Sequence, residues 1–142
     1  MKHPLFLSML LLLGCATEGP SEVSRGRGQQ VFEMHCASCH GIDGKGTVAS
    51  TAEPAGRPAD LTRISARREG VWPILEVMSI VDGYSKRVDP RPGMPIIPEI
   101  IEGPLIDFDT GNGLVATARV DVLAVAKYLE SLQVPPPTRF VP

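Results

Sequence analysis

The run CASCH at positions 36–40 is the part of the chain whose residue types and spacing can do chemistry. Two thiols three positions apart on a helical turn, Cys36 and Cys39, can each add across a haem vinyl group and form a thioether. The residue that follows, His40, can then give an axial nitrogen to the iron. A thioredoxin-like disulfide would use only the two cysteines. A zinc site needs four ligands, commonly from two separated pairs, but the chain has no second pair and His35 is poorly placed to complete a tetrahedron. We therefore expect one covalently bound haem c.

A second axial ligand would suit a haem that only carries electrons, because a filled sixth position limits rearrangement and blocks oxygen binding. Met34 and His35 precede the attachment motif on the same helix and cannot reach the opposite face of the haem. Met78 lies on the apolar stripe of a predicted helix, where a place in the core is the simpler interpretation. Met94 lies in the loop Pro92-Gly93-Met94-Pro95, whose prolines restrict φ and whose glycine permits close approach. The sequence therefore predicts His40/Met94 ligation.

Three helices are predicted to position these groups. The first begins near Ser24, a candidate N-cap, and runs through Gly28 into the haem motif. The absence of a side chain at Gly28 would let another helix approach closely, although a glycine near a helix end is also tolerated without a packing role. The second helix covers about 72–81, with Pro73 in its first turn and Gly83 just beyond its end. The last helix begins near Thr117 or Asp121 and carries apolar residues along one face until Gln133 and three prolines end it.

A small β-hairpin is predicted before the last helix. Residues 105–108 and 114–116 read as strands, and they flank the glycine-rich turn 109–113, which includes Gly111 and Gly113. The start of this turn resembles a calcium loop, but the later ligands are missing, so we do not expect calcium.

At this point the chain resembles class I cytochrome c in its bacterial monohaem form, over about residues 26–133. The resemblance rests on Cys36, Cys39 and His40 followed by Met94 in a Gly-Met-Pro setting, on the spacing Gly28-x-x-x-Phe32-x-x-x-Cys36, and on the run 125–129, VAKYL. It implies an all-α fold of three to four helices around one haem, in which Gly28 and Phe32 meet Val125 and Tyr128 of the last helix.

The segment 58–62, PADLT, looks like the family's proximal loop. The resemblance implies that the Pro58 carbonyl accepts the His40 Nδ1–H and that Leu61 lies against the porphyrin. Pro54 is an alternative to Pro58. The hairpin around Gly111–Gly113 departs from the shortest family members.

The N-terminus has the features of an export signal with a lipid attachment site. A cationic start precedes an apolar run at 5–13, which is shorter than the about 20 residues of a membrane-spanning helix. Leu12-Leu13-Gly14-Cys15 resembles a bacterial lipobox, which implies lipid on Cys15. An ordinary signal peptide with a chance cysteine is the alternative. We expect a signal peptide at 1–14, a tether at 15–24 with a reach of about 15–20 Å, a cytochrome domain at 25–134 and a proline-rich tail at 135–142.

Composition restricts the partners. The formal charge is -2 for the whole chain, and it becomes more negative when the signal peptide and its Lys2 are lost, which argues against nucleic acid. We expect a monomer on the periplasmic side of a bacterial membrane, held there by lipid. The leading hypothesis is electron transfer with redox protein partners. A dedicated subunit of a membrane dehydrogenase or oxidase is an alternative that the sequence does not separate from it. A peroxidase-like enzyme is disfavoured because no distal acid/base pair is evident.

Overall fold

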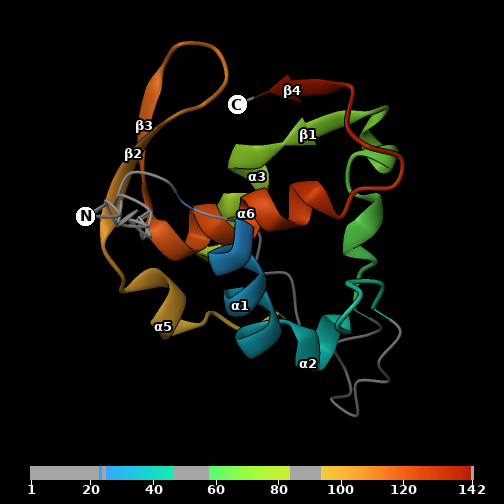
Figure 1. Cartoon of the computed structure of the whole chain (residues 1–142), viewed down its shortest axis with the longest axis horizontal. Coiled ribbons are helices and arrows are strands. Elements are labelled where there is room, and N and C mark those ends of the chain that lie inside the picture. Colours follow the sequence, from blue (N-terminus) through green and yellow to red (C-terminus); the bar gives the residue numbers. More distant parts are fainter. Residues whose placement is uncertain (1–22, 24, 47–57, 84–93, 142) are drawn as a thin grey trace, which may run out of the picture.

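A computed structural model describes residue 23 and residues 25–46, 58–83 and 94–141 (Figure 1). Helices, 3-10 turns and short strands alternate along the chain. In order they are α1 (Arg25–His35), α2 (Ala37–His40), 3-10 turns at Leu61–Arg63 and Ala66–Arg68, β1 (Val71–Pro73), α3 (Ile74–Val81), α5 (Pro98–Ile101), β2 (Leu105–Asp109), β3 (Val115–Arg119), α6 (Val120–Ser131) and β4 (Arg139–Val141). None of the helices in these described ranges is long and apolar enough to cross a membrane.

The crossing of α1 and α6 is the centre of the fold (Figure 1). A Cβ built on Gly28 would lie 2.1 Å from the Ala124 carbonyl oxygen and 2.8 Å from Tyr128 Cβ, so only glycine permits this approach. The packing role predicted for Gly28 is therefore confirmed. Phe32, which is fully buried, contacts Tyr128 with ring centroids 5.4 Å apart and ring planes tilted by 51°, as the family resemblance implied.

The other predicted elements form with small changes of boundary. The second helix starts at Ile74, two residues later than expected, because Trp72 and Pro73 belong to β1. Gly83 follows its end with a φ of 79°, a conformation that suits glycine. The β2–β3 hairpin pairs antiparallel from Leu105↔Arg119 to Asp109↔Val115. The first helix, α1, begins at Arg25, next to the expected start, whereas the N-cap candidate Ser24 itself lies outside the described residues.

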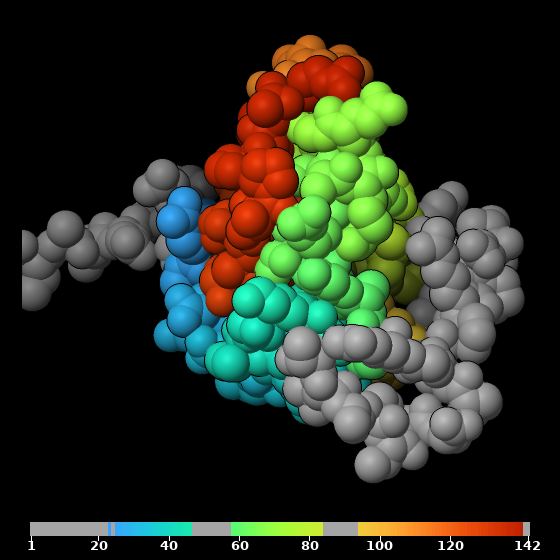
Figure 2. All heavy atoms as spheres, turned by 90° about the vertical axis from the view of Figure 1, so that its right-hand side faces the viewer, coloured from blue at the N-terminus to red at the C-terminus, as the bar shows by residue number. Residues whose placement is uncertain are grey.

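The C-terminal tail is more ordered than its prolines suggested. Its last strand, β4, pairs in parallel with β1 from Val71↔Arg139 to Pro73↔Val141. The amides of Thr138 and Arg139 both donate to the Gly70 carbonyl, at 2.9 and 3.2 Å. The C-terminal segment therefore lies alongside the 58–83 part of the chain, as Figure 2 shows.

The candidate haem attachment site

The helix that carries the attachment motif continues almost without a break through the two cysteines. Cys36 N donates to Phe32 O at 2.8 Å, and His40 N donates to Cys36 O at 2.9 Å. This single turn carries both thiols, which are free, with Cys36 buried and Cys39 exposed. The thiols therefore have the spacing along one turn that thioether formation with two vinyl groups requires.

The surroundings of Cys36 are apolar. Burial raises the pKa of the Cys36 thiol to about 11, and the neighbouring Cys39 adds to the shift. The described residues contain no group of three or more His, Cys, Asp or Glu side chains that could hold a metal ion. Within this part of the chain, the two cysteines and His40 therefore do not form a zinc site.

The ring of His40 is held by a backbone carbonyl. Its Nδ1 lies 3.1 Å from the carbonyl oxygen of Ala59. A proton on Nδ1 that is donated to this oxygen leaves Nε2 with its lone pair, which is the tautomer that an iron ligand needs. The expected acceptor, Pro58 O, is wrong by one residue, because the Pro58 carbonyl is directed instead against Gly46, where an added Cβ would lie 2.2 Å from it. Pro54, the alternative, lies outside the described residues.

A glycine-rich loop places this carbonyl. Gly46 N donates to His40 O at 2.8 Å, and Leu61 N donates to Gly44 O at 2.7 Å. Gly44 and Gly46 have φ values of 71° and 65°, in the left-handed region that glycine adopts without strain. The loop after the motif is therefore tied to the segment 58–61 by its backbone, so the acceptor for the His40 ring is fixed by the fold.

The buried side chain of Gln133 holds the same segment from the other side. Its Nε2 donates to Leu61 O at 2.8 Å, and its Oε1 accepts from Ser65 N at 2.9 Å. Val134 N donates to Thr62 O at 2.9 Å. Sequence reasoning assigned Gln133 only to the end of α6. Its signal was a polar residue directly after an apolar helical face, which does not reveal a buried partner 72 residues away.

Asp60 is a second residue that sequence reasoning missed. Its Oδ1 accepts from Thr62 N at 2.8 Å and from Thr62 Oγ1 at 2.7 Å, capping the turn that carries Leu61. Partial burial acts to raise the pKa of Asp60, but the Thr62 hydrogen bonds, together with Arg67 and Arg63, outweigh it and lower the pKa. The Asp-x-Thr spacing was the available signal.

The methionines separate as the sequence indicated. Met78 is buried in the core cluster, whereas Met34 on α1 is 74% exposed. Met94 is half-buried and packs against the hydrophobic core, as Leu61 does. Its role as an axial ligand stays a prediction. Pro92 and Gly93 lie outside the described residues.

The indole Nε1–H of Trp72 is a buried hydrogen-bond donor. Its side chain is 1% exposed, and within the described ranges Nε1 has no hydrogen-bond acceptor. A buried donor without an acceptor destabilises a fold, and a bound group that carries acceptor oxygens would remove this cost. The donor set of Cys36, Cys39 and His40 fits a covalently bound haem, and the unpaired Trp72 donor is compatible with a bound group that carries acceptor oxygens.

A family model, Cytochrome c, matches residues 26–133. The chain therefore belongs to the cytochrome c family, and the expected class I cytochrome c is confirmed. The family binds haem c, generally through cysteine, and has a haem-based role in electron transfer. No curated protein and no solved structure matches the chain.

Proposed function

We propose that this protein is a monohaem electron carrier with axial ligands from His40 and Met94, anchored to the periplasmic side of a bacterial membrane through lipid on Cys15. A haem iron bound at this site would supply a one-electron exchange between Fe(III) and Fe(II). The observation that carries the proposal is the fixed orientation of the His40 ring by Ala59 O, next to two free thiols on one helical turn.

In this proposal, different residues attach the haem, ligate its iron and exclude water from it. Cys36 and Cys39 would hold the porphyrin, and the Ala59 carbonyl would keep His40 in the ligating tautomer. A thioether ligand such as Met94 raises the reduction potential, as in cytochromes c generally. Apolar packing around Leu61 lowers the local dielectric and supports the same effect.

Substitution of Met94 tests the ligation. Oxidised wild-type protein is expected to show the weak near-infrared sulfur-to-iron charge-transfer band of Met-ligated cytochromes, and Met94→Ala is expected to abolish it. Met78→Ala is the matched control, because this methionine belongs to the core, and it should keep the band while losing about 2–5 kcal/mol of stability. A band that survives in Met94→Ala and disappears in Met78→Ala would contradict the assignment.

An electron carrier and a peroxidase-like enzyme differ in whether an external ligand can reach the sixth coordination position of the haem iron. If the Met94 sulfur fills it, reduced wild-type protein should bind carbon monoxide poorly and turn over peroxide slowly while exchanging electrons quickly with an electrode. Met94→Ala should increase both carbon monoxide binding and peroxide turnover, which absorbance spectroscopy measures directly. Rapid, saturable peroxide turnover by the wild type would support the enzyme instead.

A further inference from the structure

The β2–β3 hairpin ends in a projecting turn that begins at the exposed carboxylate of Asp109 and continues into exposed apolar side chains. A Cβ added to Gly111 or Gly113 would meet no atom within 4 Å, which shows that the turn stands clear of the domain. Leu114 and Val115, next to this turn, are 65% and 71% exposed. None of the nine residues 110–118 carries a charge. Adjacent exposed apolar side chains at a projecting tip indicate a contact surface better than single scattered ones do.

Several polar groups of the turn form hydrogen bonds within it. Asp109 Oδ1 accepts from the amides of Gly111 and Gly113 at 2.7 and 3.1 Å. Asn112 Oδ1 accepts from Leu114 N at 3.0 Å, and Thr110 N donates to Leu114 O at 3.0 Å. Amides that are already bonded lose less on entering a less polar environment, and the charged Asp109 would stay in the polar headgroup layer. The turn also holds Leu114 in a defined position, which lowers the entropic cost of docking.

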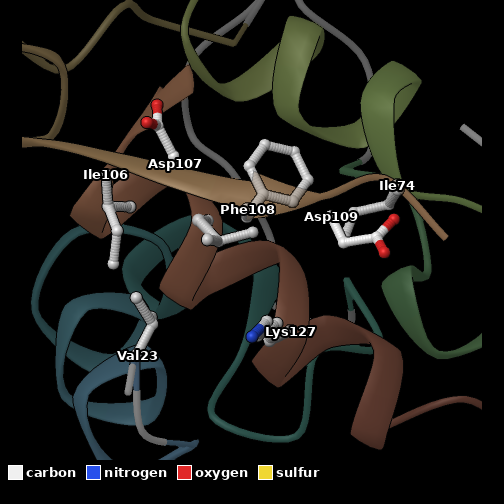
Figure 3. Close-up of a pocket in the computed structure, with 8 residues that line it drawn as sticks. Val23, Ile74, Ile106, Asp107, Phe108, Asp109 and Lys127 are labelled. Atoms are coloured by element: carbon white, nitrogen blue, oxygen red, sulfur yellow. The ribbon is translucent and has the colours of Figure 1, made fainter. Parts of the chain in front are cut away.

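The start of the described chain lies against this hairpin. Val23 lines a cavity of about 290 Å³ together with Ile106 and Phe108 of β2 and Leu123 of α6 (Figure 3). Cys15 is only eight positions earlier, so a fully extended chain would place it within about 29 Å of Val23. The motif helix α2 lies at the opposite end of the molecule from the hairpin, as both Figures 1 and 2 show.

We infer that Leu114 and Val115 insert into the interfacial layer of the lipid bilayer, as a second contact beside the lipid on Cys15. The inference rests on the proposed lipid anchor and extends it. Two apolar side chains bind a membrane weakly alone, but a lipid anchor on Cys15, eight positions before a residue that lies against β2, raises their effective concentration at the surface. Two contacts restrain the rotation of the domain relative to the membrane. They turn the haem attachment segment away from the bilayer, so that it faces soluble redox partners or the parts of membrane proteins that extend from the membrane.

Hydrogen–deuterium exchange on the haem-loaded, lipidated chain tests this contact. The protein is incorporated in vesicles of phosphatidylethanolamine and phosphatidylglycerol that contain no other protein, and its Cys15→Ser form is mixed with the same vesicles. The amides of residues 110–116 are expected to exchange roughly threefold or more slowly in the anchored form, because local burial protects amides. The double variant Leu114→Asp/Val115→Asp should lose this difference. Met34→Asp, which alters an equally exposed apolar residue on α1, should keep it.

The outcomes distinguish the hairpin contact from the anchor. Intact mass without a diacylglyceryl group on Cys15 would overturn both. Lipidated protein whose tip exchanges as fast as the Cys15→Ser form would overturn the hairpin contact and leave the anchor standing. Protection that appears only in native membranes, and not in the protein-free vesicles, would also overturn it, because the occupant would then be a membrane protein.

Discussion

The orientation of His40 depends on one carbonyl that contacts its ring and on further residues that do not. Ala59 supplies the carbonyl, and the neighbouring Asp60 caps the next turn through Thr62. Arg67 donates from both Nη atoms to Asp60 O at 3.0 Å, so the carbonyl that follows Ala59 is also held. The orientation of the His40 ring is therefore a property of a short segment and of the side chains that stabilise it.

Asp60→Ala is expected to lower the free energy of unfolding by about 1 kcal/mol at neutral pH, as the loss of a cap usually does. The folded pKa of Asp60 lies below its ordinary value. Its contribution is therefore complete above the unfolded pKa of about 3.9 and is lost as the pH falls through the folded value. Urea unfolding at neutral pH and near pH 3, followed by haem absorbance, measures both effects.

Asp60→Asn is the matched control. The amide keeps an acceptor oxygen for Thr62 N but carries no charge. It should retain most of the stability at neutral pH and remove the pH dependence assigned to Asp60. An Asp60→Ala variant that costs the same at both pH values would show that the carboxylate charge does not contribute.

Residue types and spacing predicted the attachment motif but not its support. Cys36, Cys39 and His40 are adjacent in the sequence, so a local pattern contains the whole signal. The acceptor for the His40 ring was predicted one residue early, because the choice between neighbouring carbonyls depends on how Gly46 packs against Pro58. The role of Gln133 could not be predicted either, because its hydrogen-bond partners come from a segment that is distant in the sequence.

At the scale of elements, the contact of α1 with α6 positions the attachment turn. The closest approach is at Gly28, two turns before Cys36, and Phe32 lies between them on the same face. Because the cysteines extend α1, any shift of this helix moves the attachment turn with it. The crossing therefore serves both stability and the placing of the thiols.

Gly28→Ala is expected to lower the stability of the protein by about 1–3 kcal/mol, because the new Cβ would collide with the α6 backbone, which cannot move without displacing the helix. Gly26→Ala, at an exposed position of the same helix, should be neutral or slightly stabilising, since alanine has the higher helix propensity. Thermal unfolding of the two variants provides the comparison. Equal effects would indicate that Gly28 is only a local helix-propensity position.

The three longer helices and the hairpin were predictable because their signals are periodic and local, whereas the four-residue helix α5 was not predicted. The apolar stripe on α6 and the glycine-rich turn between β2 and β3 are examples. The pairing of β1 with β4 was not predictable, because each strand has three residues and the two strands are separated by most of the domain in the sequence. Three residues carry too little periodicity to identify a strand, and the prolines before β4 suggested an irregular tail.

At the scale of the whole molecule, the proposed anchor accounts for the third cysteine. Cys15→Ser is expected to move nearly all of the haem protein from the membrane fraction to the soluble fraction, because the described helices offer no span that could replace the lipid. Fractionation followed by haem staining measures this, and mass spectrometry of the wild type identifies the mature terminus. A mature terminus elsewhere, or a variant that stays with the membrane, would contradict the anchor.

The parallel pairing of β1 with β4 also bears on where the domain ends. The family match stops at residue 133, but β1 obtains its partner strand only from residues 139–141. Contacts between segments so far apart in the sequence form late, after loop-closure entropy has been overcome. During synthesis, β1 therefore pairs only after residues 139–141 emerge, although the cysteines of the attachment motif appear early. A chain shortened to the family boundary would leave β1 without this partner strand, so the structured part of the chain extends beyond the part that defines the family.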